Sequence, residues 1–115
     1  MGTYTDDQVR NSIQGVKVEG SATVAATTYT VIDTVSIVNV GHTATAAVTV
    51  TLSSAEIAKV GRKFIIVDTG DNAGTNNITV ATEDSETIGG SATGSISADS
   101  GTLNLVSDGS NLFIL

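Results

Sequence analysis

The segment RKFIIVDTGDNAGTNNITVAT, residues 62–82, carries the strongest structural pattern in this chain of 115 residues. Four consecutive apolar residues, from Phe64 to Val67, lead into a polar run of Asp, Gly, Asn and Thr, and an alternating stretch begins at Ile78. β-Branched and aromatic residues favour strands, whereas Gly, Asn and Asp favour the turns between strands. The segment therefore predicts two β-strands joined by a polar loop.

The same pattern extends over most of the chain in both directions. The stretches VKVEGSATV, TTYTVIDTVSIVNV, AVTVTL, GSISA, TLNLVS and LFIL are rich in β-branched or apolar residues and are separated by short runs of Gly, Asp, Ser and Asn. This rhythm predicts an all-β domain over residues 15–115, a compact antiparallel β-sandwich or a barrel-like or β-prism unit. The turns recur at intervals of about ten residues without a fixed repeat, which indicates a meander rather than a solenoid.

Two short helices are expected within this β-rich chain. Near the N-terminus, Thr5 and Gln8 have the spacing of a helix-capping pair, and residues 1–14 are expected to form an anchoring segment. The partner-binding residues expected in this segment are Tyr4, Val9 and Ile13. A second capping pair, Ser53 and Glu56, predicts a helix of one or two turns that ends near Gly61.

Composition excludes several classes of function. Aromatic residues make up 3% of the chain, so bulky core residues are scarce, and we expect copies of the chain to share a core. The net charge is −7, the basic residues form no stripe, and nucleic-acid binding is not expected. No apolar run has the length of a membrane span, so no membrane partner is expected. The absence of cysteine excludes disulfides and thiolate chemistry.

The polar loop after Val67 is the segment that most resembles a chemical site. It lacks the acidic spacing of an EF-hand and the Gly-Lys-Ser/Thr ending of a phosphate-binding loop. Turn formation by Gly70, Asn72, Gly74 and Asn76, with left-handed conformations among them, is the favoured interpretation. The alternative is a cation site with Asp68 and Asp71 as ligands, and no other metal ligand or cofactor is expected.

No catalytic residue is expected anywhere in the chain. His42 is the only histidine, and no Gly-x-Ser-x-Gly elbow positions a serine nucleophile. Glu83, Asp84 and Glu86 crowd one predicted turn without a neighbouring aromatic residue, which indicates a solvated turn rather than a glycosidase pair. Threonine and serine line one side of several strands, and the sequence leaves open whether they bond between subunits or face solvent.

Residues 72–80, 86–89 and 107–111 read NAGTNNITV, ETIG and SDGSN. This combination resembles a segment found in virion proteins of tailed bacteriophages and archaeal tailed viruses. The similarity covers roughly residues 62–115. One departure is Leu112, followed by Phe113, where these proteins usually carry an aromatic residue directly after the last Asn.

The resemblance implies a structural β-module without catalytic residues, often trimeric. Its short length suits a protein that decorates a viral capsid, with the major capsid protein and two further copies of itself as partners. The expected location is the virion, after assembly in the host cytoplasm. The alternative is a tail-fibre or tail-tip module that binds a host-surface glycan or receptor.

Overall fold

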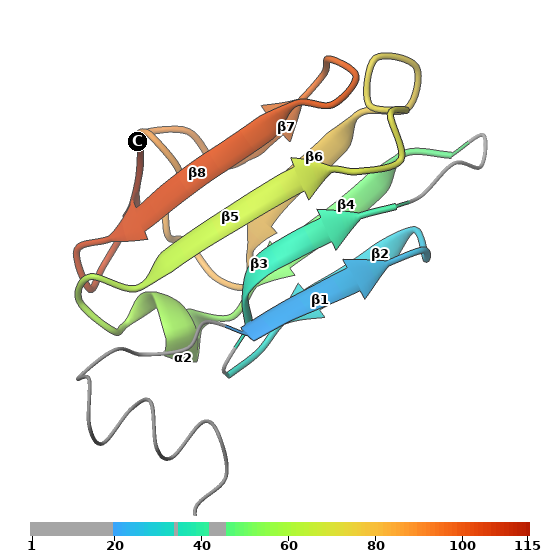
Figure 1. The fold of residues 1–115 in the computed structure, drawn as a ribbon. Helices are drawn as coiled ribbons and strands as arrows, with labels where there is room; N and C mark the ends of the chain where they lie inside the picture. Colours follow the sequence, from blue (N-terminus) through green and yellow to red (C-terminus); the bar gives the residue numbers. More distant parts are fainter. Residues whose placement is uncertain (1–19, 34, 42–45) are drawn as a thin grey trace, which may run out of the picture.

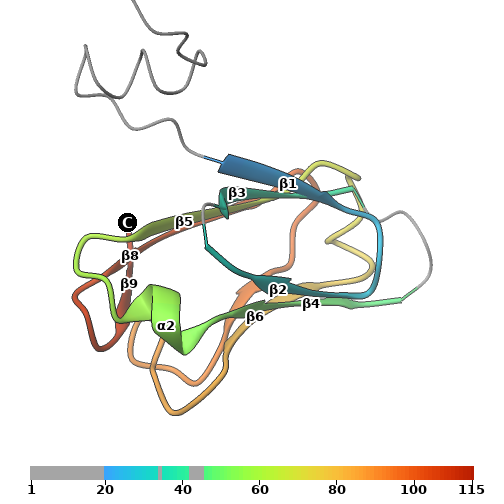
Figure 2. The same ribbon diagram turned by 90° about the horizontal axis from the view of Figure 1, so that it is seen from below.

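The computed structural model describes residues 20–33, 35–41 and 46–115. These residues form two sheets that lie one above the other, with almost no helix (Figure 1, Figure 2). The five-stranded sheet A has the order β1-β3-β5-β8-β9, and the four-stranded sheet B has the order β2-β4-β6-β7. The prediction of an all-β chain is confirmed.

The strands of sheet A alternate along the chain with those of sheet B. Sheet A contains β1 (Gly20–Val24), β3 (Val35–Val40), β5 (Lys63–Asp68), β8 (Thr102–Ser107) and β9 (Leu112–Ile114). Sheet B contains β2 (Thr28–Val31), β4 (Val48–Leu52), β6 (Ile78–Thr82) and β7 (Gly94–Ile96). From β1 to β6 the chain changes sheet at every step, so it winds as a flattened coil.

This winding makes the first six strands parallel to their neighbours within each sheet, and the expectation of an antiparallel meander is wrong for them. β1, β3 and β5 are parallel neighbours, as are β2, β4 and β6, whereas β7, β8 and β9 add in antiparallel orientation. The short turns were the misleading signal, because here they join strands in opposite sheets rather than neighbours within one sheet. Both sheets are therefore mixed.

The coil leaves no fixed period in the sequence. Tyr29 pairs with Val50 and Val50 pairs with Val80, so the number of residues between paired positions changes from one turn of the coil to the next. The extra residues are accommodated in the connections, including the helix α2 (Ser54–Ile57) between β4 and β5. A search for repeats in the sequence therefore cannot detect this winding.

The core lies between the two sheets and consists mainly of β-branched side chains. Alternate residues of each strand point inward, because successive side chains of a strand face opposite sides of its sheet. Phe64 is the largest fully buried side chain, and Leu52, Ile57 and Ile66 are also fully buried. Burial of each such side chain contributes about 1.5–3 kcal/mol relative to its exposure.

Helix α2 begins as its sequence predicts. The Ser53 hydroxyl accepts a hydrogen bond from the Glu56 amide, at 3.4 Å. The carboxylate of Glu56 has a different role from that of a capping residue, because it binds Lys59 and Arg62. Gly61 follows the helix with φ +82°, a left-handed conformation that favours glycine and ends the helical path.

Arg62 joins α2 to the beginnings of two strands in sheet A. Its Nε donates to Glu56 Oε1 at 2.9 Å, and Nη1 donates to Ser36 Oγ at 2.8 Å and to the Lys63 carbonyl at 2.6 Å. Nη2 donates to the carbonyl of Val35. Arg62 is 9% exposed, and these four partners satisfy the hydrogen-bonding groups of its guanidinium.

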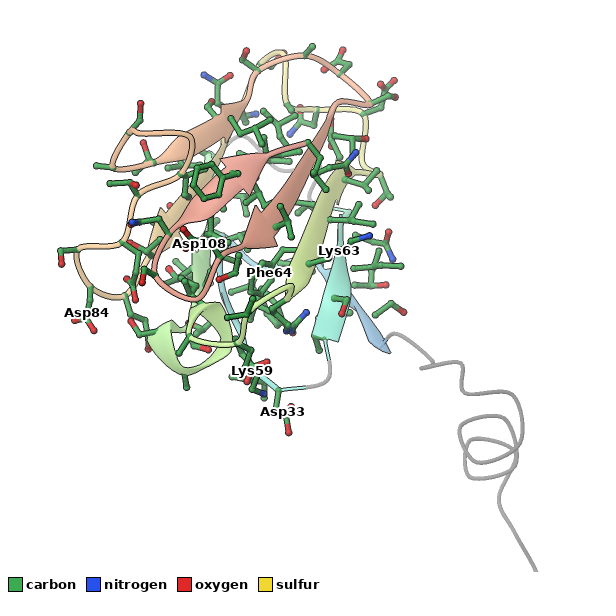
Figure 3. All side chains as sticks on the ribbon, turned by 90° about the vertical axis from the view of Figure 1, so that its left-hand side faces the viewer. Asp33, Lys59, Lys63, Phe64, Asp84 and Asp108 are labelled. Carbon is green, nitrogen blue, oxygen red and sulfur yellow. The ribbon has the colours of Figure 1, made fainter. Side chains whose placement is uncertain are left out.

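Two further contacts complete this buried ion pair. The guanidinium lies over the Phe64 ring, 4.4 Å from its centroid, in a cation–π arrangement. Lys59 Nζ donates to the second oxygen of Glu56 at 2.7 Å and lies 3.5 Å from Asp33 at the end of the molecule where α2 lies (Figure 3). Burial would raise the pKa of Glu56, but hydrogen bonds from Lys59 and Arg62 outweigh it and lower that pKa.

We expect Arg62→Met to lower the free energy of unfolding by about 3–5 kcal/mol, because it leaves the buried Glu56 charge without its main partner. Lys59→Met is the matched control, since Lys59 is exposed and a smaller loss is expected. The double variant Glu56→Gln/Arg62→Met should recover part of the loss. Chemical denaturation measures all three, and an equal loss in Arg62→Met and Lys59→Met would contradict this role for Arg62.

Candidate functional site

The polar loop after β5 is organised by one buried carboxylate. Asp68 is 3% exposed, and its Oδ2 accepts hydrogen bonds from the amides of Ala73 at 2.8 Å, Asn72 at 2.9 Å and Ser100 at 3.1 Å. Burial would raise the pKa of Asp68, but these amides and that of Gly70 outweigh it, so the pKa lies below its usual value. The carboxylate thus holds two loops together as an anion.

Further hydrogen bonds join this loop to the connection between β7 and β8. Ser100 Oγ donates to Asp71 Oδ1 at 2.8 Å, and the Gly74 amide donates to Asp99 Oδ1 at 2.8 Å. A Cβ atom at Gly74 would lie 2.9 Å from the same Asp99 oxygen, so glycine permits this close approach. The two loops therefore form one hydrogen-bonded unit at the end of β5.

The structure locates the left-handed residues of this unit differently from the sequence-based expectation. Asp71 has φ +56° and Ser100 has φ +59°, whereas Gly70, Asn72, Gly74 and Asn76 do not have positive φ. Aspartate tolerates the left-handed conformation better than most residues. The four residues named from the sequence still lie in the connection, but its left-handed residue is Asp71.

The geometry favours the turn interpretation of this loop over a cation site. Asp68 directs one oxygen at three amides and Asp71 binds a serine hydroxyl. In the part of the chain that the structure describes, no three His, Cys, Asp or Glu residues are grouped so that they could hold a metal ion. Asp68 and Asp71 are the ligands that a cation would use, and the binding experiment below tests this.

The acidic turn after β6 contacts the beginning of α2. Glu83 Oε1 accepts from the Ser54 amide at 2.7 Å, and Asp84 Oδ2 accepts from Ser54 Oγ at 3.0 Å. Glu86 Oε1 accepts from the Asp84 amide at 3.2 Å. Burial would raise the pKa of Glu86, but hydrogen bonds, with that of Ser54 the largest, lower it. These contacts give the three acids a structural role in which they fix the turn to the helix.

Two of the motifs singled out in the sequence, residues 86–89 and 107–111, lie against each other. The Thr87 amide donates to Asn111 Oδ1 at 2.8 Å, and the Leu112 amide donates to the Thr87 carbonyl at 2.8 Å. The Gly89 amide donates to the Leu112 carbonyl at 2.9 Å. The ETIG and SDGSN segments therefore form one structural unit, although more than fifteen residues separate them in the sequence.

Glycines in this unit adopt conformations that other residues avoid. Gly89 has φ +57°, Gly90 has φ +86° and Gly109 has φ +97°. A Cβ atom at Gly109 would also lie 2.9 Å from Val60, beyond helix α2. The backbone conformation alone therefore explains why glycine occupies these positions.

The outer side of sheet A carries an apolar face. The outward residues pair across strands, Ile37 with Ile65, Lys63 with Val106, and Val106 with Phe113. Phe113 is 51% exposed, and the aliphatic members are half-buried by their neighbours. We call the apolar residues on this side the apolar face. It consists of Ile37, Ile65, Val67, Val106 and Phe113, and the outward residues Asn39, Lys63, Thr102 and Asn104 lie among them.

The outer side of sheet B carries hydroxyl groups instead. Thr28 pairs with Thr49 and Thr49 with Thr79, so their outward side chains form a row across three parallel strands. The row ends at Ser95 of β7. In a second row, Thr30 pairs with Thr51 and Thr51 pairs with Ala81. We call this surface the threonine face, and it consists of Thr28, Thr30, Thr49, Thr51, Thr79, Ala81 and Ser95.

Sequence reasoning noted the threonines but did not place them, and it missed the apolar face. In a single chain the threonines lie at the surface, because Thr28 and Thr30 are exposed and Thr49 and Thr51 are half-buried. The available signal for the apolar face was Ile65 within the run of four apolar residues, since alternate members of such a run point outward. Tyr4, Val9, Ile13 and His42 lie outside the described residues.

We expect Asp68→Asn to lower the free energy of unfolding at neutral pH by about 1.5–3 kcal/mol, because the amides lose a charged acceptor. The pKa of Asp68 is lowered in the folded state, so its contribution is present above the unfolded value, near 3.8, and is lost as pH falls through the folded value. The difference between the wild type and the variant should therefore shrink below about pH 4. Denaturation from pH 7 to pH 2 measures it.

The same variants test the cation alternative. Asp71→Asn is the second variant, because Asp71 is the other candidate ligand; its carboxylate is exposed and accepts a hydrogen bond from the Ser100 hydroxyl. We expect calcium chloride to leave the melting temperature of the wild type and of both variants unchanged. A calcium-dependent increase in the wild type that both variants lose would establish the cation site and contradict the turn interpretation.

The described residues include no helix that is long and apolar enough to cross a membrane. No protein-family model matches the chain, and no curated protein sequence matches it. Its function is therefore inferred from the two outer faces and from the motifs described above.

Proposed function

We propose that this chain is a non-enzymatic structural protein of a tailed-virus particle, one that binds the outside of the capsid and reinforces it. Three copies would associate through their apolar faces, and the major capsid protein would be the second partner. The observation that carries the proposal is the apolar face of sheet A, whose residues stay half-buried or exposed in the part of the chain that the structure describes.

The pairing of the two motifs supports the resemblance on which the viral assignment rests. Thr87 forms one hydrogen bond with Asn111 and one with Leu112, and a third joins Gly89 to Leu112, so the two motifs have a shared structural reason to occur together. A motif that builds a fold rather than a site is what a structural module requires. The viral role itself rests on the resemblance.

The apolar face supports self-association. Its aliphatic members lie on three adjacent strands of sheet A, and Phe113 extends it onto β9. Burial of apolar surface contributes about 25 cal/mol per Å². Coverage of a few hundred Å² per chain would thus add several kcal/mol, comparable to the whole stability of a small domain.

Charge explains why an assembly would use this face rather than the loops. The chain has a net charge of −7, so most surfaces of two copies repel each other. The outward positions of the strands of sheet A carry one charged side chain, that of Lys63, and its charge is positive. Copies that meet at this face therefore avoid the repulsion that acidic loops would cause.

We expect light scattering with mass determination to give three times the mass of one chain at micromolar concentration. Ile65→Lys should convert this species to monomer, because it buries a charge in the contact, while the circular dichroism spectrum stays unchanged. Thr49→Lys, on the opposite face, is the matched control and should retain the trimer. A wild-type protein that is monomeric under these conditions would contradict the self-association.

The capsid role has its own test. Purified protein should bind to shells that lack it and raise their resistance to heat and osmotic shock, whereas Ile65→Lys should protect them less. Shells that bind none of the wild-type protein would refute capsid decoration. Inhibition of infection by the free protein, without binding to shells, would instead assign the chain to a tail module that binds a host glycan.

A further inference from the structure

The threonine face of sheet B is a regular array whose hydroxyl groups have no role inside the protein. Inward and outward residues alternate strictly in β2 and β4, so that Tyr29, Val31, Val48 and Val50 contact the core while the threonines point away. Across the described residues, the hydroxyl groups of this face form no hydrogen bond with another protein group. Hydration or an external partner must therefore satisfy them.

The parallel register fixes the spacing of the array in two directions. Thr28, Thr49 and Thr79 form one row, and Thr30 pairs with Thr51 in the second. Neighbouring strands lie about 4.8 Å apart, and alternate residues of one strand lie about 6.6 Å apart. Threonine is stiff at χ1, so each hydroxyl and methyl group has a defined position. The face is thus a regular array of hydroxyl and methyl groups.

The charge of this face restricts the partner. The outward positions of the strands of sheet B carry no charged side chain, although the chain as a whole has a net charge of −7. An uncharged surface on an acidic protein complements an uncharged partner and offers nothing to an ionic one. These outward positions also carry no aromatic side chain for stacking on a sugar ring, because Tyr29 points inward.

We propose that the threonine face binds ice, a lattice of ordered, uncharged water. The rows place hydroxyl groups on neighbouring strands about 4.8 Å apart, close enough for ordered water molecules to bridge them. Water molecules held between the methyl groups and hydrogen-bonded to the hydroxyl groups would continue the crystal. This inference does not depend on the virion role, which uses the opposite face of the molecule.

Ice growth in the presence of the full-length protein is the direct test. We expect the wild type to produce thermal hysteresis, to shape ice crystals and to inhibit recrystallisation at millimolar concentration. Thr51→Lys, in the middle of the array, should abolish most of this activity. Ala81→Thr should increase it, because a threonine there would complete the second row across β2, β4 and β6.

Thr102→Lys is the matched control, since Thr102 is an exposed outward residue of sheet A, and its activity should equal that of the wild type. Circular dichroism of every variant excludes loss of fold as the cause. Absence of thermal hysteresis in the wild type would refute the proposal. Equal activity in Thr51→Lys would refute the assignment to this face. Binding of the wild type to an insoluble neutral polysaccharide that Thr51→Lys loses, with no effect on ice, would assign the face to a glycan instead.

Discussion

The structure depends on the in-register parallel pairing of successive turns of the coil. Tyr29, Val50 and Val80 are paired on the inner side of sheet B, while their neighbours Thr28 and Thr49 are paired on the outer side. A shift of one residue in any pair would bring hydroxyl groups into the core and expose valines, so burial and register enforce each other. The same pairing produces the lattice of threonines outside.

Two buried charged residues, Arg62 and Asp68, hold the two ends of strand β5 in place. Arg62 fixes the beginning of the strand to α2 through Glu56, and Asp68 fixes its end to the loops at Ala73 and Ser100. Connections that cross from one sheet to the other cannot complete their hydrogen bonds within a sheet, so side-chain charges supply the partners of backbone groups there. This explains why the most conspicuous polar loop of the sequence has a structural role.

The local features of the fold follow from the sequence, whereas its topology does not. The capping pair of Ser53 and Glu56 predicts the beginning of α2, and the apolar run from Phe64 predicts β5, because both signals are local. Whether Val50 pairs with a parallel or an antiparallel neighbour depends on which sheet a short turn leads to. The turn residues alone carry no information about that choice. Strand alternation predicts that Ile65 and the threonines point away from the core, but their alignment into faces across neighbouring strands follows from the topology and could not be derived from the sequence.

Nuclear magnetic resonance contacts between β4 and β6 test this account most directly. The parallel register predicts cross-strand nuclear Overhauser effects that connect Thr49 with Thr79 and Thr51 with Ala81, in the same order along both strands. Contacts in the reverse order, Thr49 with Ala81 and Thr51 with Thr79, would show antiparallel strands. That result would contradict the coil and both of the faces that it generates.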